Sequence, residues 1–296
     1  MRPDLASLEL FLHAVESSSL SKAAERSHIA LAAVSRRIAM LEAQLGVTLL
    51  DRSSRGVKPT PAGVVLAQHA RQVLQEVGRL TGELSEYARG IKGRVRLHSS
   101  TSALTQFLPE QLASFSSMFP DIRLDLEEKR SLEIIQALAL GTADVGVIVE
   151  GPPTDGLQTF RYQTDQLVAV LPKGHPVRER RIAFEALLDY DFASLESSTS
   201  ITRSLMRAAA SVNRPLRLRV QVWSFEAMCR MVQAGLGVGV LPRKAAEMFS
   251  ASHELRLVPL TDDWATRQHL ICVRELKTLP AHARRLVEHL LQDVKA

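Results

Sequence analysis

The sequence has very few cysteines and no apolar run long enough to cross a membrane. Cys229 and Cys272 are the only two cysteines in 296 residues, and their wide separation matches no metal-ligand pattern, so we expect a reducing compartment and no disulfide. No secretory signal pattern is present either. The sequence therefore predicts a soluble, cytoplasmic protein with no membrane partner.

The motifs of common enzyme classes are also missing. There is no G-x-S-x-G elbow, no P-loop and no H-E-x-x-H pair. The GLGVG run at 235–239 follows a helical pattern and precedes a strand pattern, the reverse of the order that a dinucleotide site needs, so we interpret its glycines as structural. His282 and His289, seven residues apart, have no third ligand in sequence. We expect no enzyme activity, no metal and no cofactor.

Positive charge is concentrated near the N-terminus. Residues 1–94 hold 13 Lys and Arg against 9 Asp and Glu, whereas residues 95–296 hold 24 against 23. The excess has the sign that attracts phosphate, although its size is modest. The length leaves room for a small domain and a larger one of about 200 residues.

Residues 20–52 have the pattern of a helix-turn-helix. Ser21 is a favourable N-cap for a first helix ending near Ser27, with a turn over 28–30. In the second helix the apolar residues are spaced four, three and four apart, which buries one face. These residues are Val34, Ile38, Leu41 and Leu45. The opposite face is narrow and cationic, as a helix that enters a DNA groove requires. It carries Ala32, Arg36, Ala39, Met40 and Ala43, with Ser35 and Arg37 on its flanks.

The neighbouring segments complete a small DNA-binding domain. Residues 4–18 predict an amphipathic bracing helix. Residues 51–60 contain Arg52, Arg55 and Lys58 without a helical period, which favours a basic wing lying along phosphates over a solvated charged turn. The Thr60-Pro61 step predicts an N-cap followed by the first residue of another helix.

That next helix carries a heptad pattern. From residue 66 its apolar residues alternate four and three apart, which favours pairing with a second helix and hence a homodimer. The alternative is a helix packed on its own chain. The predicted seam consists of Leu66, Ala70, Val73, Val77, Leu80, Leu84 and Tyr87.

The N-terminal 60 residues resemble the LysR-type transcriptional regulators. The resemblance rests on Ala23-Ala24, on the run 33–36 (AVSR), on Leu41-Glu42, on Leu45-Gly46 and on the run 60–63 (TPAG). It implies a winged helix-turn-helix, a linker helix, a two-lobed effector domain similar to periplasmic binding proteins, and a homotetramer. The DNA residues that we expect are Ser21, Lys22, Leu31, Ala32, Ser35, Arg36, Arg37, Arg52, Arg55 and Thr60.

The chain departs from the family at the start of the second helix. The family often has Ser-Gln there, whereas this chain has Ala30-Leu31. Leu31 or Ala32 could contact thymine methyl groups, or Leu31 could pack on the first helix.

Residues 91–296 alternate strand and helix patterns, which predicts an open α/β sheet. We expect strands at 94–100, 122–128, 144–150, 166–172, 191–197, 216–222, 238–242 and 269–274, and helices near 106–119, 131–140 and 280–293. The predicted domains are a DNA-binding domain at 1–60, a dimerisation helix at 61–90 and an effector domain at 91–296. Crossings near 162 and 267 divide the effector domain into lobe I (91–162 and 268–296) and lobe II (163–267), with a cleft between them.

A repeated tetrapeptide marks the predicted cleft. The run SSTS occurs at 99–102 and at 197–200, each time after a strand and before a helix. Hydroxyls and helix N-termini at such positions can bind a small anionic metabolite from both lobes, although serine and threonine are also ordinary N-caps. Lys129 and Arg130 could add charge, or could belong to a solvated run. The effector residues that we expect are Ser99, Ser100, Thr101, Ser131, Ser198, Thr199 and Ser224.

The sequence thus predicts a transcriptional regulator that binds double-stranded DNA and a small-molecule effector. The competing interpretation is a solute-binding protein whose cleft is its whole function. The absence of an export signal argues against that interpretation.

Overall fold

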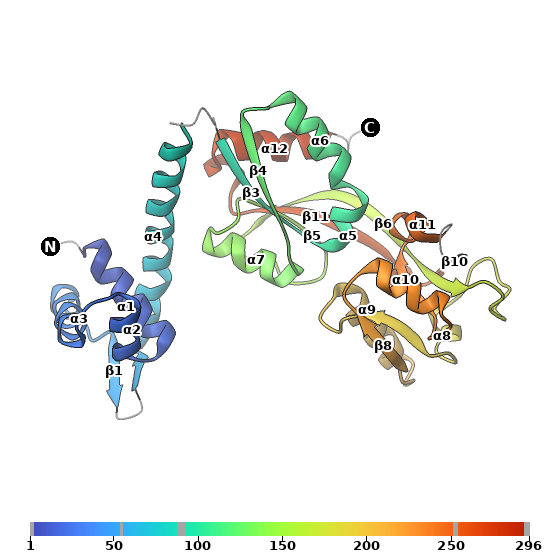
Figure 1. The fold of residues 1–296 in the computed structure, drawn as a ribbon, viewed down its shortest axis with the longest axis horizontal. Coiled ribbons are helices and arrows are strands. Elements are labelled where there is room, and N and C mark those ends of the chain that lie inside the picture. The colour runs from blue at the N-terminus through green and yellow to red at the C-terminus, as the bar shows by residue number, and fades with distance from the viewer. Residues whose placement is uncertain (1–2, 54–55, 88–92, 251–253, 293–296) are drawn as a thin grey trace. The chain divides into compact units, whose positions relative to one another are not determined.

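The computed structural model describes residues 3–53, 56–87, 93–250 and 254–292, without the side chains of residue 79 and residues 82–87. The chain divides into two compact units, Met1–Gly90 and Ile91–Ala296. Figure 1 shows the helices and strands of both units. Each unit has its own apolar core.

The first unit begins with three helices around an apolar core. They are α1 (Leu5–Ser17), α2 (Leu20–Arg26) and α3 (Leu31–Leu45). Val34, Ile38 and Leu41 are buried as the helical spacing predicted, but the prediction is wrong at Leu45, which is 38% exposed at the end of α3. The predicted N-cap of α2 is wrong, because the side chain of Ser19, two residues before Ser21, accepts the hydrogen bond from the Lys22 amide.

A hairpin and a long helix follow. Strands β1 (Leu50–Ser53) and β2 (Gly56–Pro59) pair antiparallel and form the wing. Gly56 has a φ of 119°, and a Cβ there would lie 2.4 Å from the carbonyl oxygen of Ser18, so only glycine fits. Helix α4 (Pro61–Tyr87) starts at the predicted proline, and Thr60 caps it by accepting from the Gly63 amide.

Helix α4 uses its seam residues in two ways. Ala70 is 1% exposed and packs in the core of its own chain with Ala67, and Leu66 is half-buried against the same core. The prediction of a uniform partner-facing seam is therefore wrong at Ala70. Val73 and Leu80 are exposed and Val77 is half-exposed. The side chains of Leu84 and Tyr87 lie outside the described residues.

The second unit is built on a seven-stranded sheet. Its strands run in the order β10-β6-β11-β5-β3-β4, and β9 pairs with β6. The parallel strands are β3 (Gly93–Ser99), β4 (Ile122–Glu128) and β5 (Val145–Val149), and the antiparallel ones are β6 (Gln158–Pro172), β9 (Gly239–Pro242), β10 (Leu255–Pro259) and β11 (Thr266–Val273).

Helices cover both faces of the first lobe. On one face α6 (Leu108–Met118) and α12 (Ala281–Gln292) pack over β3, and on the other α7 (Ser131–Leu140) covers β5 (Figure 1). The helix predicted near 106–119 is confirmed as α6, and a separate short helix, α5 (Thr101–Gln106), precedes it with a break at Phe107.

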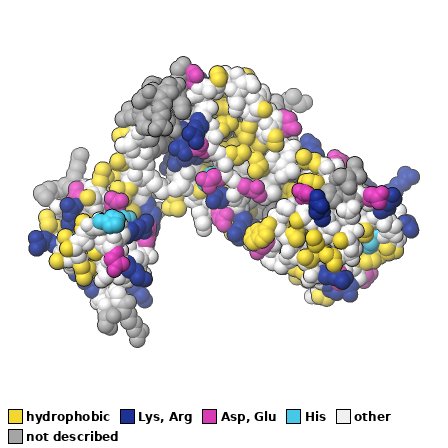
Figure 2. Space-filling model, in the orientation of Figure 1, with side chains coloured by type: hydrophobic (Ala, Val, Ile, Leu, Met, Phe, Trp, Pro, Cys, Tyr) yellow, Lys and Arg dark blue, Asp and Glu magenta, His cyan; other side chains and the backbone are white. Residues whose placement is uncertain are grey.

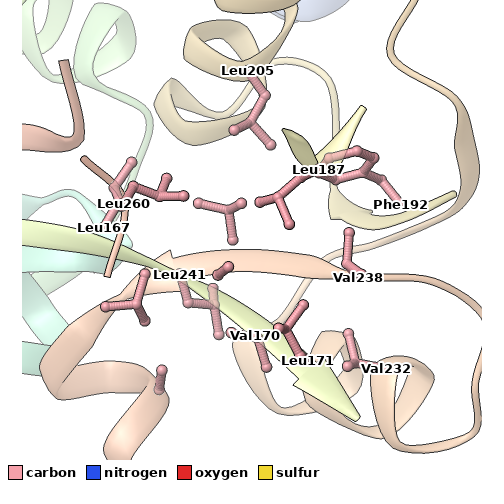
Figure 3. Packing of buried hydrophobic residues seen from close by; sticks show 14 of the residues in the cluster. Leu167, Val170, Leu171, Leu187, Phe192, Leu205, Val232, Val238, Leu241 and Leu260 are labelled. Carbon is pink, nitrogen blue, oxygen red and sulfur yellow. The ribbon is translucent and has the colours of Figure 1, made fainter. Parts of the chain in front are cut away.

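The second lobe packs around the distal half of β6. A separate parallel pair, β7 (Phe192–Leu195) and β8 (Leu218–Val222), lies in it with α8 (Phe184–Leu187), α9 (Ser200–Ser211), α10 (Phe225–Gln233) and α11 (Arg243–Ser250). Leu167, Leu187, Phe192 and Leu241 are fully buried in its apolar core (Figure 3).

Strands β6 and β11 run through both lobes, and a buried polar cluster marks their crossing. Asp165 on β6 accepts hydrogen bonds from Arg267 Nε at 2.8 Å and from Gln106 Nε2 at 2.9 Å. His269 Nε2 lies 3.0 Å from the same carboxylate. Asp165, Arg267 and His269 are all at most 6% exposed, so the carboxylate compensates a buried guanidinium.

This cluster makes the stability of the second unit pH-dependent. Burial alone would raise the pKa of Asp165, but the hydrogen bonds from His269 and Arg267 and the charge of Arg267 outweigh it and hold the pKa well below 3.8. Because the folded-state pKa is depressed, the stabilisation is present above the unfolded pKa and is lost as the pH falls toward the folded one.

We predict that Asp165→Asn lowers the free energy of unfolding by about 3–5 kcal/mol at neutral pH, because it leaves Arg267 buried without a counter-charge. Urea denaturation followed by tryptophan fluorescence measures this unit selectively, since Trp223 and Trp264 both lie in it. The variant should also show a weaker stability loss below about pH 4 than the wild type. Asp155→Asn, at an exposed loop position, is the matched control. Equal unfolding midpoints in both variants would contradict the prediction.

Candidate DNA interface and ligand cleft

The free face of α3 is exposed as predicted. Ala32, Arg36, Ala39, Met40 and Ala43 all lie on the surface of the first unit. Within the described residues the Arg36 guanidinium makes no hydrogen bond or ion pair, so it is available to another molecule. Figure 2 shows basic side chains on the visible surface of this unit. Small residues around one free arginine give a helix face that can approach a DNA groove closely.

The start of α3 lacks a polar cap. Ala30 provides no side-chain hydrogen bond at the N-terminus. Leu31 is 47% exposed and borders a surface hollow that Ser21 and Glu25 of α2 also line. Leu31 therefore lies beside the first helix of the motif and still presents half of its surface outward.

The residues flanking α3 differ in how they are held. Arg37 pairs with Asp4 at 3.5 Å, so part of its charge is offset at the N-cap of α1. Arg52 of the wing donates to Ser35 Oγ at 3.0 Å and thus joins the wing to α3.

Three other predicted DNA residues can also be placed, and one cannot. Ser21 and Lys22 are exposed on α2. The hydroxyl of Thr60 donates to the Thr48 carbonyl at 2.8 Å and caps α4, so it has a structural role. Arg55 lies outside the described residues.

A cavity of about 340 Å³ lies between the lobes of the second unit. It is lined from lobe I by the start of α5 and the β4–α7 junction, and from lobe II by the β7–α9 segment and the end of β8. Five of the seven predicted effector residues line it. These are Ser100, Thr101, Ser131, Ser198 and Thr199.

Two predicted residues do not line the cavity. Ser99 is fully buried at the end of β3, and its hydroxyl donates to the Ser100 carbonyl. Ser224 caps α10 by accepting a hydrogen bond from the Ala227 amide. Both side chains are used by the fold, which sequence spacing alone could not distinguish from ligand contact.

The cavity hydroxyls are not equivalent. Thr199 caps α9, accepting from the Thr202 amide and donating to the Glu196 carbonyl at 2.9 Å. Thr101 donates to the Glu128 carboxylate. Ser100 Oγ, by contrast, is buried without a hydrogen-bond partner, and an unpaired buried hydroxyl is costly unless a ligand or water meets it.

The cavity is also lined by charged residues that lie outside the repeated SSTS runs. Glu128 and Glu133 belong to lobe I, whereas Glu196 and Arg203 belong to lobe II. Hydrogen bonds from the Ser198 hydroxyl and amide lower the pKa of Glu196, which therefore stays ionised. The sequence held one signal for Arg203 as a cavity residue, which is its position near the start of the helix that follows the second SSTS run.

One contact joins the lobes across this cavity. Arg130 donates to Ser198 Oγ at 2.6 Å, while its Nε lies 3.4 Å from Glu133. In Figure 2 acidic and basic side chains are interspersed on this unit. The cavity is therefore lined by both signs of charge in addition to the hydroxyls that the sequence suggested.

The two cysteines are unreactive thiols at neutral pH. Burial raises the pKa of the Cys229 thiol to about 11 and that of Cys272 to about 12, so neither forms a thiolate at neutral pH. Within the described ranges no group of His, Cys, Asp or Glu could hold a metal ion. No described helix is long and apolar enough to cross a membrane.

The two lobes should respond differently to loss of a hydroxyl. Thr199→Ala removes an N-cap and should lower the free energy of unfolding by about 0.5–2 kcal/mol. Ser100→Ala removes a hydroxyl that has no hydrogen-bond partner, so the free energy of unfolding should stay unchanged or rise slightly. Urea denaturation of the two variants measures the difference, and equal losses would contradict these roles.

Comparison with known proteins identifies the family. Residues 88–295 match the model of the LysR substrate binding domain, and residues 5–64 match the bacterial regulatory helix-turn-helix protein, lysR family. The chain is 30% identical over 245 residues to the probable HTH-type transcriptional regulator LrrA of Synechococcus elongatus, covering 82% of each chain.

Solved structures share the fold. CbnR complexed with its target DNA has a TM-score of 0.66 at 20% identity, covering 98% of this chain and 99% of that one. The regulatory domain of CcmR from Synechocystis PCC6803, in complex with 2-PG, has a TM-score of 0.63 at 22% identity and covers 69% of this chain and 98% of that one. The relatives are regulators rather than enzymes, and the resemblance inferred from the sequence is confirmed. The chain belongs to the LysR family of transcriptional regulators.

Proposed function

We propose that this regulator changes its action on DNA when a small anionic metabolite binds between the lobes of residues 91–296. The observation that carries the proposal is the cavity of about 340 Å³ with Ser100 in one lobe and Ser198 in the other. Its volume is within the range of small-molecule sites. A ligand that contacts both lobes binds one interlobe geometry better than another, and this differential affinity is what couples a site to a conformational change.

A protein that shares this fold binds a small molecule. The CcmR regulatory domain was solved with 2-PG bound. A solute-binding protein would share a cleft of this kind, but its function would not require a helix-turn-helix with an exposed arginine. The free Arg36 on α3 favours the regulator.

The DNA contact is assigned to the exposed face of α3 in the major groove, with the wing on the phosphates. We predict that Arg36→Ala weakens operator binding by about 1–3 kcal/mol, because a bidentate arginine contact to a base edge is lost. The loss should vanish on an operator mutated at the contacted base pair. Gel shifts with DNA from upstream of the protein's own gene measure it.

Arg37→Ala is the control for this prediction, because Arg37 is adjacent on α3 but pairs with Asp4. Its effect should be smaller and similar on all sequences, as expected for a general electrostatic contribution. Arg36→Ala binding that equals wild type on every operator variant would overturn the assignment.

Helix α4 is assigned to self-association. Val73 and Leu80 are 43% and 56% exposed in the single chain, and Val77 lies on the same stripe, so a second copy of α4 would bury all three. The homodimer, and a homotetramer built from it, are part of this proposal.

Val77→Asp should disrupt the dimer, since it places an unpaired charge in the seam of both copies at a cost of several kcal/mol. Sedimentation velocity measures the change, and operator affinity should fall with it. Val64→Asp is the control, because Val64 is also exposed on α4 but lies about 140° around the helix from Val77. A Val77→Asp protein that sediments like the control would contradict the seam.

The experiment that tests the ligand response combines both units. Operator affinity of the full chain is measured with and without a metabolite that alters transcription. Ser100→Ala should weaken the binding of that metabolite by about 0.5–1.5 kcal/mol, or by more if the contact is charged. It should leave the affinity for DNA without metabolite unchanged. Full metabolite affinity in Ser100→Ala, and in Ser198→Ala as well, would place the site elsewhere.

A further inference from the structure

One charged side chain on the cavity surface has no partner among the described residues. Lys129 pairs with Glu127 at 3.2 Å, and Arg130 pairs with Glu133 at 3.4 Å. Arg203 of α9 lines the same cavity and is half-buried. Its guanidinium makes no ion pair or hydrogen bond with any described residue, although its backbone amide donates to the Thr199 carbonyl at 3.1 Å. A partly desolvated guanidinium without a counter-charge is stabilised by an anion that enters the cavity.

We propose that Arg203 binds the single carboxylate of the effector, which is a monoanion with a flat apolar body. The proposal rests on the proposed function, because it names the ligand class of the same cavity. Ser100 supplies a second contact from the opposite lobe, since its buried hydroxyl is free to donate. A planar carboxylate can accept from the arginine fork and from a hydroxyl together.

The surrounding carboxylates limit the ligand to one negative charge. Glu128, Glu133 and Glu196 all line the cavity. Arg130 lies beside Glu133 and bonds to Ser198, so it offsets only part of this negative charge. The lowered pKa of Glu196 keeps its carboxylate ionised. A phosphorylated ligand would bring a second negative charge close to these groups, and like charges repel strongly in a partly desolvated site.

The rest of the ligand meets an aromatic surface. Trp223 at the end of β8 is 77% exposed, more than any other large hydrophobic residue in the described part of the chain. It lines the cavity with Phe225, Leu195 and Ile201, which are all buried. An exposed indole beside a cavity provides a flat apolar face that a ligand ring can cover.

The test uses Trp223 as its own reporter. Trp264→Phe leaves Trp223 as the single tryptophan of the full-length chain. Emission of this protein is titrated with phenylacetate and 3-phenylpropionate, with the neutral phenylacetamide, and with phenyl phosphate. The titrations are repeated after Arg203→Gln and after Arg207→Gln. Arg207 is the matched control, because it is exposed on the same helix and does not line the cavity.

We expect both monocarboxylates to change the Trp223 emission at millimolar or lower concentration. Arg203→Gln should lower the affinity for both acids about tenfold to a hundredfold, as expected for loss of a charged hydrogen bond. Arg207→Gln should change this affinity by less than about twofold. Phenylacetamide and phenyl phosphate should each bind at least about tenfold more weakly than the acids.

Three results would overturn the proposal. They are failure of both acids to bind, unchanged affinity in Arg203→Gln, and binding of the amide or the phosphate as tight as that of the acids. If a ligand of another charge class alters both the Trp223 emission and operator binding, this inference fails and the proposed function stands. If a ligand alters operator binding without changing the Trp223 emission, the cavity itself is excluded.

Discussion

The buried ion pair between Asp165 and Arg267 is the interaction on which the effector unit depends. It lies where β6 and β11 pass from one lobe to the other, and His269 and Gln106 also contact the Asp165 carboxylate. Breaking one partner of such a pair is far more costly than losing a surface contact. The two strands are thereby fixed side by side, and both lobes are placed relative to the cavity.

The same cluster reaches the cavity directly. Arg267 also donates to Ser102 Oγ at 3.1 Å, and Ser102 lines the cavity in the first turn of α5. A ligand contact at Ser100 therefore lies two residues from a group bonded to the crossing strands. One hydrogen bond thus links the cavity wall to the strands that connect the lobes, and a physical link of this kind is what a ligand-dependent change of lobe geometry would require.

Local periodicity predicted much of the fold. The helix at 131–140 and the strand at 122–128 have the predicted bounds, because each carries a clear pattern between strong boundary residues. The first half of β6, from Gln158, and all of β10 were missed, since their strand pairing is antiparallel and distant in sequence and their alternation is weak. The short helix α5 was not predicted as a separate element, because its six residues are too few to show a helical period.

The candidate site was only partly predictable. The repeated SSTS runs pointed to Ser100 and Ser198, but no pattern showed that Ser99 is buried or that Thr199 is used as a cap. Arg203 was not singled out, because its significance lies in having no partner, and pairing depends on tertiary structure. Ala70 shows the same limit on α4, where a heptad spacing cannot distinguish the core of its own chain from a partner helix.

The central claim is that one ligand contacts both lobes of residues 91–296. Hydrogen exchange of the full-length protein, resolved by peptide and measured with and without an effector that alters operator binding, tests it most directly. The account predicts slower exchange at residues 99–103 of lobe I and, at the same effector concentration, at residues 196–203 of lobe II. Slower exchange in one lobe alone, or only within residues 3–87, would contradict it.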